Sequence, residues 1–233
     1  MREELMINEI FHSIQGESTW AGVACTFIRL TGCHLRCGYC DTEYAFHEGR
    51  KMSLGEIMEK IHGFGCRVVE VTGGEPLLQK PVHSLMKQLC DERYTVLLET
   101  SGSLDIQSCD SRIIRIMDIK TPGSGEEKSN RWENFNHLNH NDEIKLVLTD
   151  MRDYQWSRQI IQQYNLVEKV KAVLLSAVNQ VSPGKELAGA QGFSPRTLAD
   201  RMLADQRAGL LPGKVRFQMQ LHKLIWDPTA RGV

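Results

Sequence analysis

The chain has 233 residues, of which 41% are hydrophobic and 24% charged, and its formal net charge is −1. This length and apolar share allow a proper core, so we expect a single domain over residues 1–233, and the near-neutral charge argues against nucleic acid as a partner. Residues 1–5 do not form the start of a signal peptide, and no run of about 18 apolar residues occurs. We therefore expect a cytoplasmic protein with no membrane contact.

Short apolar runs alternate with helical patterns along the chain, which is the sequence form of repeated βα units on a parallel sheet. The candidate strands are residues 24–30, 67–72, 95–99, 113–119, 144–148, 170–175 and 215–219. Several are apolar nearly throughout, as expected of strands that are covered on both faces. The pattern predicts an α/β fold, an incomplete parallel (β/α) barrel similar to part of a TIM barrel.

Capping residues mark the beginnings of three helices. Ser53 and Glu56 form a capping box, and this helix should stop at Gly63. Asp150 can cap a second helix, and Ser194, followed by a proline, can cap a third.

Residues 124–142 are polar and rich in turn-forming residues. No packed element is visible in the first half of this segment. We expect it to be an exposed connection or a lid.

Three closely spaced cysteines form a C-x3-C-x2-C run: Cys33, Cys37 and Cys40. They offer three thiolates and no fourth, which suits an iron–sulfur cluster with one iron left open. A zinc knuckle that uses His34 or His47 as the fourth ligand is the alternative. The other cysteines are scattered, do not form a disulfide framework and are interpreted as buried or incidental thiols: Cys25, Cys66, Cys90 and Cys109.

Polar motifs follow three successive candidate strands, at the edge where parallel α/β sheets place their ligand sites. In Thr72-Gly73-Gly74-Glu75-Pro76, the glycines would let the backbone approach a ligand closely and Glu75 could accept from an ammonium group. An ordinary strand-to-helix turn is the alternative for this motif taken alone. The next two strands end at Glu99-Thr100-Ser101-Gly102 and Asp118-Ile119-Lys120-Thr121-Pro122.

With Tyr39 before the last cysteine, the run C-x3-C-x-aromatic-C resembles the signature of the radical S-adenosylmethionine superfamily. The resemblance implies a [4Fe-4S] cluster on Cys33, Cys37 and Cys40, with S-adenosylmethionine at the open iron. It implies S-adenosylmethionine contacts from the cysteine loop and the strand ends: Tyr39, Cys40, Asp41, Gly73, Gly74, Glu75, Ser101, Asp118, Ile119, Lys120 and Ser176.

Segments near both ends of the chain, residues 7–17, 27–33, 40–42 and 220–223, make the chain similar to the 7-carboxy-7-deazaguanine synthase family. That family converts 6-carboxy-5,6,7,8-tetrahydropterin to 7-carboxy-7-deazaguanine with loss of ammonia, toward deazapurines such as queuosine. The resemblance implies Mg²⁺ at Thr42, a homodimer, a flavodoxin or ferredoxin reductant, and no catalytic side chain, because the cluster and S-adenosylmethionine generate the radical.

The same resemblance implies a set of substrate contacts: Ile14, Gln15, Gly16, Glu17, Arg29, Thr72, His222 and Val233. Arg29 would pair with the carboxylate of the pterin, because a planar guanidinium suits a two-pronged grip. The carboxylate of Val233 would reach back to the bound pterin.

Two other classes remain as alternatives. A glycyl-radical activase would share the cysteines and the Gly-Gly-Glu-Pro loop, but residues 15–17 and 220–223 argue against it. A ferredoxin-like carrier or a zinc-binding module would not need the Gly-Gly-Glu-Pro loop.

Overall fold

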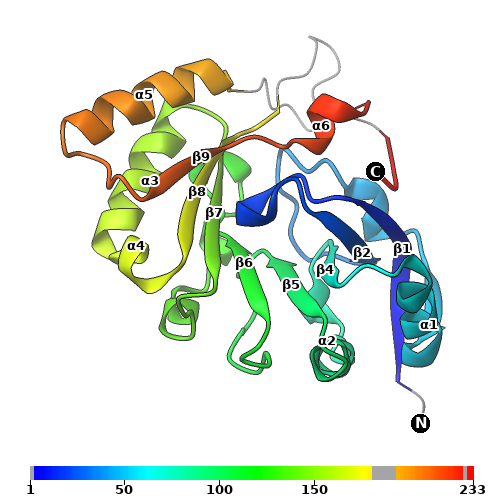
Figure 1. Cartoon of the computed structure of the whole chain (residues 1–233). Coiled ribbons are helices and arrows are strands. Elements are labelled where there is room, and N and C mark those ends of the chain that lie inside the picture. The colour runs from blue at the N-terminus through cyan, green and yellow to red at the C-terminus, as the bar shows by residue number, and fades with distance from the viewer. Residues whose placement is uncertain (1–2, 180–192, 228–229) are drawn as a thin grey trace.

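The computed structural model describes residues 3–179, 193–227 and 230–233. Its strands are β1 Glu4–Ile14, β2 Ala24–Leu30, β3 Arg50–Ser53, β4 Val68–Gly73, β5 Thr95–Thr100, β6 Ile114–Asp118, β7 Glu143–Leu148, β8 Ala172–Ala177 and β9 Val215–Gln218. Within the described residues they form one sheet in the order β3-β1-β2-β4-β5-β6-β7-β8-β9. β1 is antiparallel to β2 and β3, and every later pair is parallel. The sheet curves without closing (Figure 1), which confirms the incomplete barrel.

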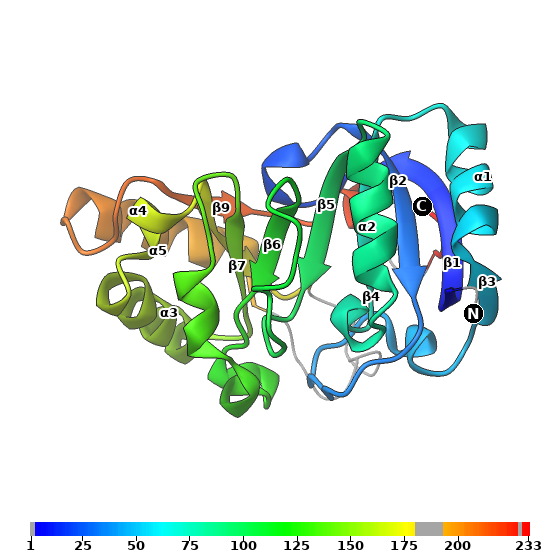
Figure 2. The same ribbon diagram turned by 90° about the horizontal axis from the view of Figure 1, so that it is seen from below.

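Helices cover the outer face of this sheet (Figure 2). They are α1 Leu54–Phe64, α2 Val82–Asp91, α3 Met151–Gln163, α4 Leu166–Lys169 and α5 Pro195–Arg207. The short helix α6 His222–Ile225 lies apart from them, near the C-terminus (Figure 1). Among the described residues, no helix is both long and apolar enough to cross a membrane.

Side chains along the strands alternate between the apolar core on one face of the sheet and polar residues on the other. On β4, Val69 and Val71 belong to the core cluster, which also contains Ile57 of α1. Their neighbours Glu70 and Thr72 are buried polar residues, and successive strand side chains point to opposite faces. The concave face of the sheet therefore carries the polar groups.

The expected helix starts are confirmed. Ser53 and Glu56 form the capping box of α1, and the carboxylate of Asp150 accepts two backbone N–H groups at the start of α3. The stop at Gly63 is wrong, because α1 continues through Phe64 and ends where Gly65 adopts the left-handed conformation (φ 66°).

Two strands of the structure are absent from the prediction. β1 carries polar residues among its apolar ones and has a register shift between Ile7 and Glu9. β3 has four residues and, among the described strands, pairs only with β1. Both depend on their antiparallel partners, which a local pattern does not reveal.

Residues 124–142 connect β6 to β7, as expected, but the connection is not exposed throughout. Short 3-10 turns form part of the segment, and Ser124, Asn134 and Phe135 are buried. The side-chain amide of Asn134 donates to the carbonyl oxygens of Gly102 and Leu104, at 2.9 and 2.8 Å. A polar side chain can therefore be buried here because it satisfies backbone groups.

Candidate active site at the carboxyl ends of the strands

The three clustered cysteines lie in the loop that follows β2. Cys33, Cys37 and Cys40 are free thiols of intermediate burial. Burial raises the pKa of Cys37 to about 11 and raises the pKa of Cys33 and Cys40 in the same direction. Because thiolates are the ligands, a metal or cluster bound here must displace the three protons.

The segment after β6 supports this cysteine loop. The backbone N–H of Gly38 donates to the carbonyl of Ser124 at 2.9 Å, and that of Arg36 donates to Glu126 at 2.6 Å. The Arg36 guanidinium donates to the carbonyl of Cys33 at 2.9 Å and lies 4.5 Å from the ring centre of Phe46. Sequence reasoning missed Arg36 and Glu126, because their contacts join loops that are far apart in the chain.

The two glycines at the end of β4 approach the cysteine loop very closely. A Cβ added to Gly74 would lie 2.3 Å from the carbonyl oxygen of Gly32 and 2.6 Å from Cβ of Cys33. Gly73 has φ +148°, and a Cβ there would lie 2.3 Å from the carbonyl oxygen of Leu30. These glycines therefore let two loops meet.

Glu75 ties the ends of β4 and β5 together. Its fully buried carboxylate accepts from the backbone N–H groups of Leu77 (3.0 Å) and Ser101 (2.8 Å). It also accepts from the hydroxyls of Thr100 and Ser101. The predicted ammonium acceptor thus already has a structural role.

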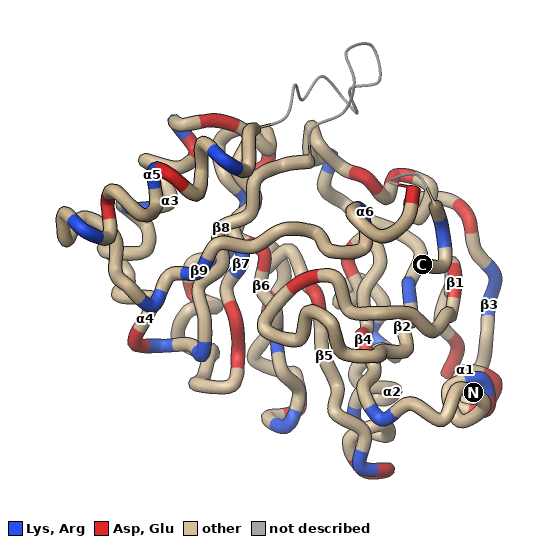
Figure 3. Tube along the Cα trace, turned by 45° about the horizontal axis from the view of Figure 1, so that its top comes forward, with Lys and Arg blue, Asp and Glu red and all other residues tan. Residues whose placement is uncertain are grey.

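A charged network lies in the interior behind the cysteine loop, and Figure 3 shows charged positions on the central strands. Lys145 of β7 contacts the carboxylates of Glu17 (2.8 Å), Glu99 and Asp118 (3.8 Å). The ammonium of Lys120 donates to Asp118 at 3.0 Å. The predicted residues Glu17, Asp118 and Lys120 are therefore brought together, and Glu99 and Lys145 were not among the predicted site residues.

Burial and neighbouring charges shift the pKa values of the acidic residues in this interior in opposite directions. Burial would raise the pKa of Glu17, but Lys145 outweighs it and holds that pKa at about 2. Burial raises the pKa of Glu70, hydrogen-bonded to Gln15, to about 7 and that of Glu99 to about 8. The interior therefore retains protons near neutral pH.

The donor set at the cysteine loop fits an iron–sulfur cluster with a further ligand. The hydroxyl of Tyr39 and Oδ1 of Asp118 are buried and lack a hydrogen-bond partner among the described residues, which leaves them free for a bound molecule. His34, a possible zinc ligand, instead has Nε2 2.9 Å from the hydroxyl of Ser103. In the described part of the chain, no three or more His, Cys, Asp or Glu side chains converge on a site for a single metal ion.

The N-terminal and C-terminal segments meet beside the cysteine loop. The backbone N–H of Leu221 donates to the carbonyl of Gly16 at 2.9 Å, and a Cβ on Gly16 would lie 2.1 Å from Nδ1 of His222. The side-chain amide of Gln220 donates to Glu17 at 2.9 Å. The predicted residues Gly16, Glu17 and His222 therefore lie together.

A cavity of about 210 Å³ lies between the C-terminal end of β1 and the C-terminal residues of the chain. It is lined by His12, Ser13, Ile14, Trp226, Gly232 and Val233. The hydroxyl of Ser13 is buried and has no hydrogen-bond partner among the described residues. Ile14 and Val233 were predicted substrate residues, whereas His12 and Ser13 carry no motif that would have identified them.

The remaining predicted residues occupy different surroundings. Asp41 forms an ion pair with Lys223 and accepts from the Thr42 hydroxyl at 3.1 Å. Arg29, next to Thr72 in the sheet register, donates from Nε to Glu9 at 2.7 Å. Ser176 is buried near the end of β8.

Comparisons with known proteins agree with this geometry. A family model described as the Radical SAM superfamily matches residues 27–119. A 7-carboxy-7-deazaguanine synthase from Koribacter versatilis is 41% identical over 98% of this chain and 100% of the relative, and one from Chlorobaculum tepidum is 43% identical over 98% and 97%. This chain belongs to the 7-carboxy-7-deazaguanine synthase family. The family predicted from the sequence is therefore confirmed.

As a member of the 7-carboxy-7-deazaguanine synthase family, the chain is a radical S-adenosylmethionine enzyme, which uses a [4Fe-4S] cluster and S-adenosylmethionine. The crystal structure of QueE from Escherichia coli superposes with a TM-score of 0.71 at 22% identity, covering 94% of this chain and 95% of that chain. This likeness concerns the fold, and it supports the partial barrel.

Proposed function

We propose that this chain converts 6-carboxy-5,6,7,8-tetrahydropterin into 7-carboxy-7-deazaguanine, with loss of ammonia, as a step toward deazapurines such as queuosine. The likeness to the synthases over nearly the whole chain supports this reaction. The observation that carries it is the bridge formed by the C-terminal segment. Gln220 contacts Glu17 of the proposed substrate segment, and Lys223 pairs with Asp41 of the cysteine loop.

In this proposal, Cys33, Cys37 and Cys40 hold the [4Fe-4S] cluster. When bound, the cluster supplies the electron for reductive cleavage of S-adenosylmethionine. The proposed S-adenosylmethionine contacts are Tyr39, Cys40, Asp41, Gly73, Gly74, Glu75, Ser101, Asp118, Ile119, Lys120 and Ser176. The free hydrogen-bonding capacity of Tyr39 and Asp118 supports this set.

Arg29 is the proposed partner of the substrate carboxylate. Among the described residues, Arg29 donates a hydrogen bond only from Nε, to Glu9, so both Nη nitrogens can donate to a carboxylate. Ile14, Gln15, Gly16, Glu17, Thr72, His222 and Val233 complete the proposed substrate contacts. Burial lowers the pKa of His222, which favours a neutral imidazole there.

Thr42 is the proposed Mg²⁺ contact. Its hydroxyl oxygen lies beside the carboxylate of Asp41, and Mg²⁺ prefers oxygen ligands. We further propose a single domain, a cytoplasmic homodimer, and a flavodoxin or ferredoxin as reductant.

The test is an anaerobic assay of the reconstituted enzyme with reductant, Mg²⁺, S-adenosylmethionine and 6-carboxy-5,6,7,8-tetrahydropterin, read by mass spectrometry. 7-Carboxy-7-deazaguanine should form. Formation of 5′-deoxyadenosine without this product would reject the proposed substrate.

Arg29→Lys sharpens this test, because lysine keeps the charge and loses the planar fork. The Michaelis constant for the pterin should rise roughly 10- to 100-fold, which is the effect of a charge-assisted hydrogen bond. Iron content should stay unchanged. An unaltered Michaelis constant would remove Arg29 from the proposed site.

A further inference from the structure

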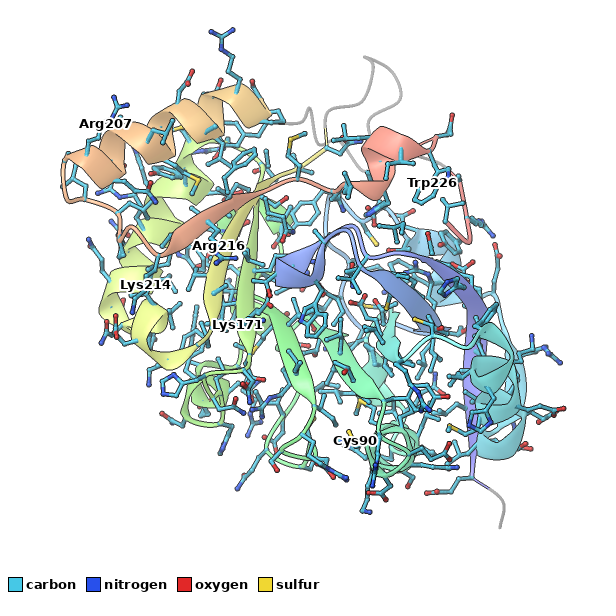
Figure 4. The ribbon with its side chains drawn as sticks, viewed as in Figure 1. Cys90, Lys171, Arg207, Lys214, Arg216 and Trp226 are labelled. Carbon is cyan, nitrogen blue, oxygen red and sulfur yellow. The ribbon has the colours of Figure 1, made fainter. Side chains whose placement is uncertain are left out.

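The C-terminal residues run along the part of β1 that lies beyond its pairing with β3. β3 pairs with residues 4–7 of β1. A Cβ on Gly232 would lie 3.9 Å from the Glu9 carboxylate and 4.0 Å from Cβ of Phe11. Gly232 and Val233 then line the cavity beside Trp226, which Figure 4 labels close to α6. The position of this tail therefore shapes the cavity.

Arg231 attaches the tail to the loop after the cysteines. Its guanidinium lies 3.8 Å from the ring centre of Tyr44, and its Nη1 lies 2.7 Å from a carboxylate oxygen of Glu48. Nη2 donates to the second oxygen of Glu48 at 3.5 Å. A planar guanidinium can stack and form a paired contact at the same time, which lysine cannot do.

Tyr44 links Arg231 to Arg29 through Glu9. The Tyr44 hydroxyl donates to Oε1 of Glu9 at 3.0 Å, and the same oxygen accepts from Nε of Arg29 at 2.7 Å. The guanidinium of Arg29 also lies 6.0 Å from the Tyr44 ring centre. Glu9 thus fixes Arg29 through one nitrogen and is itself fixed by Tyr44.

We propose that Arg231, Tyr44 and Glu9 are positioning residues that hold the tail at the cavity and orient Arg29 toward the carboxylate of the substrate. This inference rests on the proposed function for its substrate, and on contacts of the described residues for the attachment. Arg231 acts on the tail, whereas the Tyr44 hydroxyl acts on Glu9 and Arg29. The two parts can therefore be separated by mutation.

The experiment compares Arg231→Ala, Arg231→Lys and Tyr44→Phe with Arg207→Ala as the matched control. Arg207 ends α5, far across the molecule from Trp226 (Figure 4). One readout is the rate at which carboxypeptidase Y releases C-terminal residues from the folded protein without substrate. The other is anaerobic calorimetry with 6-carboxy-5,6,7,8-tetrahydropterin, together with kcat and KM.

Arg231→Ala should speed tail release and weaken pterin binding, each about three- to thirty-fold, at nearly unchanged kcat. Arg231→Lys should recover part of both effects. Tyr44→Phe keeps the ring under Arg231, so it should leave tail release unchanged and still weaken pterin binding. Arg207→Ala should behave as wild type in both readouts.

Wild-type tail release in Arg231→Ala would overturn the attachment, whether or not the chain binds a pterin. Faster release with unchanged pterin affinity in Arg231→Ala would overturn the part of the tail in pterin binding. Unchanged pterin affinity in Tyr44→Phe would overturn the link to Arg29. Wild-type protein that fails to bind the pterin would instead reject the proposed function and leave the tail-release comparison as the test of the attachment.

Discussion

The two sides of the proposed site are held in different ways. On the cluster side, around the cysteine loop, the contacts are between backbone atoms. There is no room for a Cβ on Gly74 beside Gly32, and the N–H of Gly38 donates to the carbonyl of Ser124. On the tail side, side chains make the contacts, among them the pair of Arg231 and Glu48, which is about half exposed. Close backbone packing tolerates no added atom, whereas contacts between exposed side chains weaken gradually. Substitutions on the cluster side should therefore cause large losses of stability or cluster content, whereas substitutions on the tail side should cause small, graded losses.

Removal of a cluster ligand should have the largest effect. Cys37→Ala takes away one of three thiols that have no substitute, so iron content and 5′-deoxyadenosine formation should both fall to background. Cys66→Ala is the control, since its thiol donates to the backbone carbonyls of Ala24 and Val68 and lies outside the cysteine run. A Cys37→Ala enzyme that retained full iron content would refute the ligand assignment.

Gly74→Ala should come next, because its Cβ would overlap the carbonyl of Gly32. Overpacking of this kind costs about 1–3 kcal/mol of unfolding free energy. Thermal unfolding and iron content after reconstitution would both reveal it. Gly63→Ala, within α1 and with open space at its Cβ position, should be neutral or stabilising. Equal behaviour of the two variants would show that the loops can separate at little cost.

Glu70→Gln should produce a smaller effect that depends on pH. Burial raises the pKa of Glu70 from 4.5 to about 7, so its contribution to stability is complete below 4.5 and is lost as the pH rises through 7. The melting temperature of the variant relative to wild type should therefore increase between about pH 5 and pH 8, by about 2–4 °C for each kcal/mol. Glu59→Gln, an exposed position on α1, supplies the control. A difference that stays constant with pH would contradict the assignment.

Lys214→Ala should have the smallest effect. It lies outside both sides of the site and gives the loss of stability with which the other variants are compared. Its ammonium lies 3.0 Å from Glu168, and both side chains are more than half exposed (Figure 4 labels Lys214). Such pairs contribute roughly 0–1 kcal/mol to stability. Urea unfolding should place the variant within about 0.5 kcal/mol of wild type. A larger loss would show that exposed pairs matter more in this chain than the comparison assumes.

The sequence by itself determined the features that reside in local pattern. The cysteine spacing, the capping box of Ser53 and Glu56 and the apolar strand from residue 24 to 30 each follow from nearby residues, and each lies where it was expected. The parallel arrangement followed as well, because alternating strands and helices have few ways to pack.

Only the tertiary structure decided which distant residues meet. β1 exists as a strand because β2 pairs with it, and Asn134 is buried because the carbonyls of Gly102 and Leu104 accept its amide protons. The contact of Lys145 with Glu99, and that of Arg231 with Tyr44, join segments with no shared periodicity or spacing. Local patterns report which face a residue prefers, whereas partners across the sheet are fixed by chain topology and packing.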